Sequence, residues 1–348
     1  MDNNTTIIPS PTTYLPMVVE ASEQTTTIGE TIIDAEIINE EATATPFIEA
    51  NSTPITLESL QNDCVIPNFA KDNEAVISHS QFIGATYQAL RDYYRNEQID
   101  EPQIRVSHII RGRIPEAINK KSSELLPHEM TQYYERMAFC INVPTIYQDV
   151  NGNRLQLSIV GVKSYGRDNL NGKLTAQKFS IAVGFQNTVC CNQCIWTDGY
   201  KDDIRALSPG EIYQHTLRLL DTYDMAKHIY LLQSLGDLYL SETQFALILG
   251  KMRLYNYLPQ RIQRGIPEML ITDSMVNSVA RQYYRDPNFK VSGGGELSMW
   301  NFYNLLTGAC KGSYIDTFLS RQANALTTSL GIAEGLRDED SGYSWFIS

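Results

Sequence analysis

A period of two residues in the middle of the chain constrains the fold more than any other feature of the sequence. From residue 179 to residue 186, apolar side chains alternate with small or polar ones, and the apolar positions are Phe179, Ile181, Val183 and Phe185. Such alternation is typical of a β-strand that buries one face. A turn at residues 187–188, followed by further apolar residues up to Trp196, predicts a second strand and therefore a β-hairpin.

Two more predicted strands come before this hairpin. Arg136 to Ile146 and Arg154 to Val162 have strand character, and the linker between them contains Asn151-Gly152. An Asn-Gly pair between two such segments is a strong signal for a tight hairpin turn. Together with a short strand at Ile104 to Ile110, these segments predict a central antiparallel sheet of four to five strands.

Helical periodicity replaces the strand pattern after Gly199. Pro209 starts the first of these helices, and another helix is predicted before the sheet, from Ser78 or Ser80 to about Tyr94. The remaining helical runs lie around residues 227–235, 241–255, 273–285, 298–307 and 313–326. Because such a series of amphipathic helices usually packs on a face of a neighbouring sheet, we expect an α+β fold with a packed helical C-terminal half.

Charge is distributed unevenly along the 348 residues. The net charge is −12, yet eleven Asp and Glu residues and no Lys or Arg precede Lys71, so the rest of the chain is close to neutral. Residues 1–58 are therefore predicted to be a disordered acidic tail, which either aids solubility or folds back over a basic surface. Residues 59–200, a sheet-rich basic half, and residues 201–348, a helical half, are expected to pack as one globular unit.

A basic stretch within the sheet-rich half is the main candidate for binding. Residues 104–178 contain eleven Lys and Arg residues against six Asp and Glu residues. Base stacking on sheet aromatics, with cations along the rim, is how many proteins bind single strands. The alternative is that these cations pair with local carboxylates or lie in a solvated loop. The predicted nucleic-acid-binding residues are Arg111, Arg113, Lys163, Arg167, Lys173 and Lys178, with Tyr133, Tyr134 and Tyr165 as stacking residues.

Known catalytic and phosphate-binding motifs do not occur in the sequence, so we predict no catalytic residue and no cofactor. Cys190, Cys191 and Cys194 form the nearest approach to a metal or redox motif. A structural zinc site requires four ligands, and the sequence offers no second cysteine pair at the usual spacing. Two alternatives stay open: an enzyme whose thiol or metal site is assembled in space around these cysteines, and a protein-interaction module that uses the helical half.

The cysteines also bear on the compartment. Six cysteines in a chain of this length, with no signal peptide, are typical of reduced thiols in the cytoplasm. No run of residues approaches the roughly 18 apolar positions that span a bilayer. We therefore expect a cytoplasmic protein with no membrane partner, whose oligomeric state no pattern in the sequence predicts.

Several segments carry a resemblance to a known family. They include IRVSHIIRGRIPEA at residues 104–117, GFQNTVCCNQC at residues 184–194 and MWNFYNLLTGACKGSYIDTFLSR at residues 299–321. Over residues 60–348 the chain resembles the domain-of-unknown-function 3871 family, and more faintly a group of uncharacterised phage and plasmid proteins. The resemblance implies a protein carried by prophages or conjugative elements of gut anaerobes, and it supplies no activity, fold or catalytic residues.

One main functional hypothesis follows. We expect a nucleic-acid-associated protein of a phage or conjugative element, acting in single-strand binding, annealing or protection from host defence. Its partners would be single-stranded DNA or RNA, or a protein encoded by the host or the element. The preference for nucleic acid over the two alternatives depends mainly on the mobile-element context.

Overall fold

The computed structural model describes residues 45–64, 66, 76–168, 175–286, 289 and 296–348. Residues 45–348 form one compact unit, which combines helices with a six-stranded antiparallel sheet. The predicted α+β fold is therefore confirmed. Residues 1–44, which make up most of the predicted acidic tail, lie outside the described residues.

Four long strands make up most of the sheet. They are β5 (Arg136–Val150), β6 (Asn153–Ser164), β7 (Gln177–Asn187) and β8 (Gln193–Ala206), and each is antiparallel to the next. Between β5 and β6, φ is 48° at Asn151 and 82° at Gly152. Positive φ at both central residues is the condition of a type I′ turn, which explains the Asn-Gly pair of the predicted hairpin.

Two short strands extend the sheet beside β5. β2 (Gln103–Val106) pairs with β5, and β1 (Thr53–Ile55) pairs with β2 at the edge of the sheet. β1 belongs to a segment that the sequence assigned to the acidic tail. In the same segment, Phe47 and Ile48 are buried in a cluster that includes Phe318. Residues 45–58 are thus part of the folded unit, in contrast to the disordered tail expected there.

The predicted helices are present, and the last one is longer than expected. Ser78 opens the helix before the sheet with a capping box, because its hydroxyl accepts from the Gln81 amide while the Gln81 side chain accepts from the Ser78 amide. Within the described ranges, none of the helices combines the length and the apolar character that crossing a bilayer requires. The helices are α1 (Leu57–Asn62), α2 (His79–Tyr93), α3 (Pro209–Thr222), α4 (Met225–Ser234), α5 (Glu242–Tyr255), α6 (Gln260–Gln263), α7 (Asp273–Arg285), α8 (Met299–Cys310) and α9 (Ile315–Gly335).

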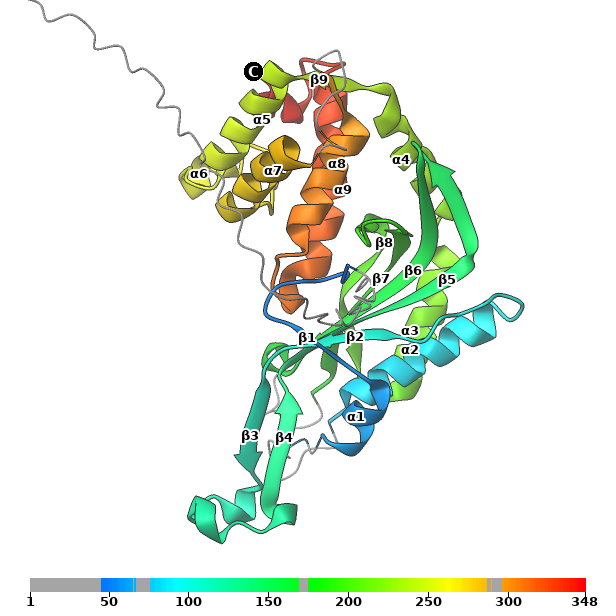
Figure 1. Ribbon diagram of the computed structural model, residues 1–348, viewed down its shortest axis with the longest axis vertical. Helices are drawn as coiled ribbons and strands as arrows, with labels where there is room; N and C mark the ends of the chain where they lie inside the picture. The colour runs from blue at the N-terminus through cyan, green and yellow to red at the C-terminus, as the bar shows by residue number, and fades with distance from the viewer. Residues whose placement is uncertain (1–44, 65, 67–75, 169–174, 287–288, 290–295) are drawn as a thin grey trace, which may run out of the picture. The chain divides into compact units, whose positions relative to one another are not determined.

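Helices cover both faces of the sheet (Figure 1). On one face, Phe139, Ile159 and Val183 belong to a core cluster that also contains buried residues of α2 and α3. On the other face, residues of alternate parity, such as Val160, pack with Phe318 at the start of α9. The two clusters show the period of two that the sequence predicted, with both faces of the strands buried where the helices lie.

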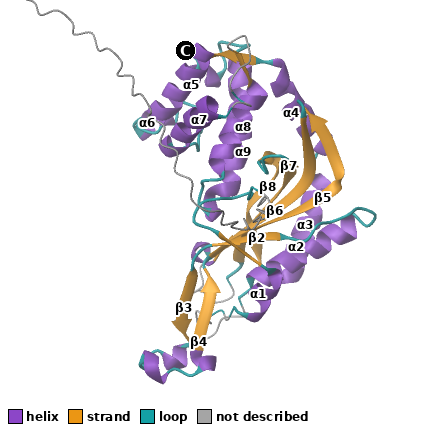
Figure 2. Cartoon of the chain, viewed as in Figure 1, coloured by secondary structure: helices purple, strands orange, loops and turns teal. Residues whose placement is uncertain are grey.

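A second, two-stranded sheet stands apart from the main sheet. It consists of β3 (Ile109–Arg113) and β4 (Met130–Tyr134), and short helical turns fill the connection between them (Figure 2). Residues 109–134 are called the arm below. The sequence predicted one strand over Ile104 to Ile110, but that segment divides at Ser107, whose hydroxyl accepts the Arg136 amide. The first part joins the main sheet and the second part starts the arm.

Small strands complete the helical half. β9 (Tyr239–Ser241) pairs with β10 (Glu296–Ser298), and each leads directly into a helix. Ser241 opens α5 with a capping box, in which its hydroxyl accepts from the Gln244 amide, and the Ser298 hydroxyl caps α8 by accepting from the Asn301 amide. These caps fix where α5 and α8 begin.

Candidate nucleic-acid interface

The arm carries two predicted phosphate ligands on one face. Arg111 and Arg113 are two residues apart on β3, and their cross-strand partners are Gln132 and Met130. The Nε of Arg111 donates to Oε1 of Gln132 at 3.2 Å, and Arg113 donates to the Lys120 carbonyl. Neither arginine takes part in an ion pair among the described residues. Both guanidinium charges are therefore available to an anionic ligand.

A buried carboxylate organises the tip of the arm. Glu129 accepts from the Leu126 amide at 2.9 Å and forms an ion pair with Lys120. The Leu126 amide, followed by Lys120, lowers the pKa of the Glu129 carboxyl. These bonds stabilise the connection between β3 and β4, in which Met130 pairs with Arg113. Residues near the arginines in the sequence therefore hold the basic face of the arm in place.

Apolar side chains are exposed on the same arm. Ile118 is 68% exposed, Leu126 is 50% exposed and Met130 is 48% exposed, although each is large enough to contribute to a core. Single exposed apolar residues are ordinary, but several on one small element are typical of an interaction surface. The arm thus combines unpaired cations with apolar contact area.

The three predicted stacking residues meet at the base of the arm. Tyr133, Tyr134 and Tyr165 line a cavity of about 190 Å³ together with His79 from the first turn of α2. The rings of His79 and Tyr165 lie 4.6 Å apart, and those of Tyr133 and Tyr165 lie 5.8 Å apart. Tyr165 is buried, so its ring is not placed to stack on a base at the surface. This cavity is called the His79 pocket below.

Lys163 is not at the surface, in contrast to its expected role as a phosphate ligand. Its Nζ lies 3.0 Å from Oδ2 of Asp168 and donates to Gln177 at 3.1 Å. The two charged side chains are 0% and 1% exposed. Burial lowers the pKa of Lys163 to about 8, although Asp168 opposes the shift. A phosphate outside the protein cannot reach this ammonium group.

The other predicted cations of the sheet-rich half differ in availability. Arg167 forms an ion pair with Asp202 at 3.2 Å and donates to Ser180, so its charge is largely compensated. Lys178 is half-buried on β7, where its backbone amide donates to Asp168. Lys173 lies outside the described residues. The structure therefore places Arg111 and Arg113 on one face of β3. They differ from Lys163 and Arg167, which form ion pairs with Asp168 and Asp202.

The cysteine run lies at the turn between β7 and β8. Cys190 and Cys191 lie in the turn between β7 and β8, where Cys191 has a φ of 55°, and Cys194 is buried on β8. Within the described part of the chain, no group of three His, Cys, Asp or Glu side chains is arranged to hold a metal ion. All six cysteines are free thiols, and burial raises the pKa of Cys194 to about 12.

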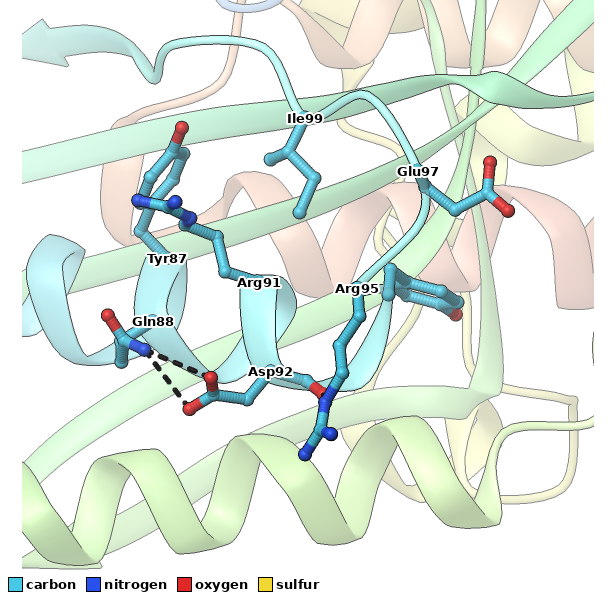
Figure 3. Close-up of a pocket in the computed structure, with 8 residues that line it drawn as sticks. Tyr87, Gln88, Arg91, Asp92, Arg95, Glu97 and Ile99 are labelled. Atoms are coloured by element: carbon cyan, nitrogen blue, oxygen red, sulfur yellow. Dashed lines mark hydrogen bonds between the residues drawn. The ribbon is translucent and has the colours of Figure 1, made fainter.

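A polar hollow at the end of α2 was missed by the sequence reasoning. Its volume is about 610 Å³, and Figure 3 shows Arg91 and Arg95 on its wall with Asp92 and Glu97. The Asp92 carboxylate accepts from Gln88 at 3.1 Å and also from Tyr213. The lining contains two cations and two carboxylates, so the hollow has no net charge to attract an anion. An i, i+4 arginine pair on a predicted helix was the available signal.

A second basic surface lies in the helical half and was also missed. Residues 243–267 contain four Lys and Arg residues and no Asp or Glu. Arg253 pairs with Asp273 at 2.8 Å, whereas Arg261 and Arg264, at α6, are exposed and form no ion pair with the described residues. Counting charges in windows along the helical half, rather than only in the sheet-rich half, would have found this segment.

Comparison with known proteins gives one match. A family model with the description "Domain of unknown function, B. Theta Gene description" matches residues 29–347, nearly the whole chain. Neither the curated proteins nor the solved structures include a match. The match therefore extends to the arm and to the helical half alike, and any activity has to be argued from the residues themselves.

Proposed function

The chain belongs to the domain-of-unknown-function 3871 family, and we propose that it binds single-stranded nucleic acid through the arm. The observation that carries the proposal is the shared face of β3, on which Arg111 and Arg113 pair with no carboxylate of the described residues. Guanidinium groups bind phosphate oxygens through two parallel hydrogen bonds, so each arginine can hold one phosphate.

The exposed apolar residues of the arm supply the second part of the interface. Ile118, Leu126 and Met130 offer contact area to unstacked bases, which a single strand presents and a duplex conceals. We place this activity in the cytoplasm, which is supported by six free thiols. We also propose that a phage or conjugative element encodes the protein, and that the protein anneals single strands or protects them from host defence.

The experiment is a salt titration of the full-length protein with fluorescent 20-nucleotide single-stranded DNA, single-stranded RNA and the matching duplexes. The arm variant is Arg111→Glu/Arg113→Glu. Each phosphate contact on a single strand contributes about 0.7 to the log–log salt slope, so losing two contacts lowers the slope by about 1.4. We expect this variant to bind single strands about tenfold more weakly, or worse, at low salt.

The matched control is Arg261→Glu/Arg264→Glu, which changes the net charge by the same amount at the second basic surface. This control should retain the wild-type slope. If both variants weaken binding equally, the protein attracts polyanions only through its general charge, and the arm is not the site. If the wild-type protein binds no single strand at low salt, the proposal fails.

A further inference from the structure

One residue that lines the His79 pocket carries a hydrogen-bond acceptor that none of the described residues satisfies. Nε2 of His79 lies 2.8 Å from the Tyr134 carbonyl, which can only accept, so Nε2 carries the proton and donates. Nδ1 of the same neutral ring is therefore an acceptor. Across the described ranges this nitrogen has no hydrogen-bond partner, and His79 is only 4% exposed. Buried polar atoms without a partner are rare in native proteins, so this one points to a missing donor.

The neutral ring is maintained by its surroundings. Burial lowers the pKa of His79 to about 3, with nearby Lys163 acting in the same direction and the bond to Tyr134 opposing it. Nδ1 is therefore unprotonated near neutral pH. The Tyr165 ring lies 4.6 Å from the imidazole, and the Lys163 ammonium, which pairs with Asp168, lies 5.0 Å from the centroid of the Tyr165 ring.

Size and wall chemistry limit what can supply that donor. A volume of about 190 Å³ is below the range of about 300–1,000 Å³ that is typical of pockets for drug-sized ligands, so there is room for one ring system. Tyr133, Tyr134 and Tyr165 provide aromatic walls. Lys163 lies behind the Tyr165 ring, 5.0 Å from its centroid, and its charge is compensated by Asp168. The pocket therefore favours a neutral planar ring over a phosphate group.

We propose that the His79 pocket takes one nucleobase of the bound strand, which donates an N–H from its Watson–Crick edge to Nδ1 of His79. The inference rests on the proposed function, because it assigns the pocket to the same single strand that the arm holds. All four bases carry an N–H on that edge, and pairing occupies it in a duplex. Because pairing occupies this edge in a duplex, binding of a base in the pocket would favour single strands. The pocket adjoins the arm, since Tyr133 and Tyr134 on β4 line the pocket and β4 is one of the two strands of the arm.

The test uses free nucleosides, which lack phosphates and cannot report on the arm. Adenosine, cytidine, guanosine and uridine are each added to the full-length protein, and saturation transfer to base and ribose protons is measured by NMR together with calorimetric affinity. The His79 imidazole nitrogens are followed in the same samples by ¹⁵N NMR. We expect stronger transfer to base protons than to ribose protons, and a shift of the Nδ1 resonance to lower frequency as it accepts a bond.

The variant is His79→Gln, whose side-chain amide keeps a donor for the Tyr134 carbonyl and lacks the acceptor at Nδ1. Loss of one buried hydrogen bond predicts nucleoside binding about fivefold to tenfold weaker. His215→Gln on α3, away from the pocket, is the control and should bind as the wild type does. The ¹⁵N measurement on the wild-type protein decides the question even if His79→Gln does not fold.

The outcomes for the pocket and for the arm are separable. If no nucleoside binds and the Nδ1 resonance does not move, the pocket inference is overturned, while a weakened arm variant still supports the proposed function. If nucleosides bind through His79 but Arg111→Glu/Arg113→Glu leaves oligonucleotide affinity unchanged, the arm proposal falls and the pocket stands. An oligonucleotide with abasic sites should retain the salt slope of the arm and lose the contribution of the pocket.

Discussion

The arm and the buried end of β6 use the same kind of residue in opposite ways. On the arm, Arg111 is exposed and Arg113 is half-buried, and neither pairs with a carboxylate in the part of the chain that the structure describes. At the end of β6, Lys163 is enclosed by Asp168, Gln177 and two aromatic rings. Both regions lie within the basic stretch of the sequence. The difference teaches that a cation is available to a ligand only where the fold supplies no carboxylate of its own.

The physical costs of the two arrangements differ as well. A charge that stays in water needs no partner, so the arm arginines cost the fold little. A charge taken out of water has to be compensated, and removing one partner of a buried pair leaves the other one uncompensated. The comparison therefore predicts large stability effects at Lys163 and Asp168, and small ones on the arm.

The largest effect is expected from Asp168→Asn. This change removes the negative charge beside Lys163 and weakens the acceptor for the Lys178 amide, which donates to Oδ1 at 2.7 Å. We expect the free energy of unfolding to fall by about 3–5 kcal/mol. Equilibrium unfolding in urea at neutral pH measures it.

The control is Asp203→Asn, which removes the carboxylate from an exposed pair with Arg205. Such pairs contribute about 0–1 kcal/mol, so the urea midpoint of this variant should stay close to that of the wild type. Equal losses in the two variants would contradict the distinction between buried and exposed pairs on which the comparison depends.

The second-largest expected effect is a rise in the free energy of unfolding with pH, which results from the lowered pKa of Lys163. Its pKa in the folded protein is about 8, below the value of about 10.4 for an unfolded chain. Between these values the unfolded state holds a proton that the folded state has released, so the free energy of unfolding rises with pH by up to about 1.4 kcal/mol per pH unit. Below pH 8 the contribution is constant.

Comparison of the wild type with Lys163→Met isolates this contribution. The difference in unfolding free energy should change between pH 8 and pH 10 in favour of the wild type, because methionine does not titrate. A difference that stays constant over this range would mean that Asp168 holds the pKa of Lys163 at its unfolded value. Tyrosine side chains titrate at higher pH in both proteins and cancel in the comparison.

The sequence predicted the sheet well because its signals are local. The alternation from Phe179 to Phe185 and the Asn151-Gly152 turn each specify a structure within a few residues, and β5 to β8 follow them. The arm was not predicted, because its separation from β2 depends on a bond between Ser107 and Arg136, 29 residues apart. No local pattern contains that information.

The candidate site was predicted in part for the same reason. The sequence grouped basic and aromatic residues by region, but whether a cation is paired depends on tertiary contacts. Lys163 finds Asp168 five residues later only because a short helical turn folds the chain back after β6. No local sequence pattern marked His79. Its Nδ1 is an acceptor because Nε2 donates to the carbonyl of Tyr134, which lies 55 residues further along the chain.

The smallest expected effect on stability is that of removing the two arginine charges of the arm. Arg111→Gln/Arg113→Gln keeps long polar side chains on β3 and removes both charges, so the hydrogen bonds to Gln132 and to the Lys120 carbonyl can be replaced by amide donors. Because neither arginine pairs with a described carboxylate, we expect the free energy of unfolding, obtained from urea titration, to change by no more than about 0.5 kcal/mol. Single-strand affinity should nevertheless fall, measured in the same preparation. A loss of stability comparable to that of Asp168→Asn would mean that the arm arginines serve the fold, and that their exposure is no argument for a ligand.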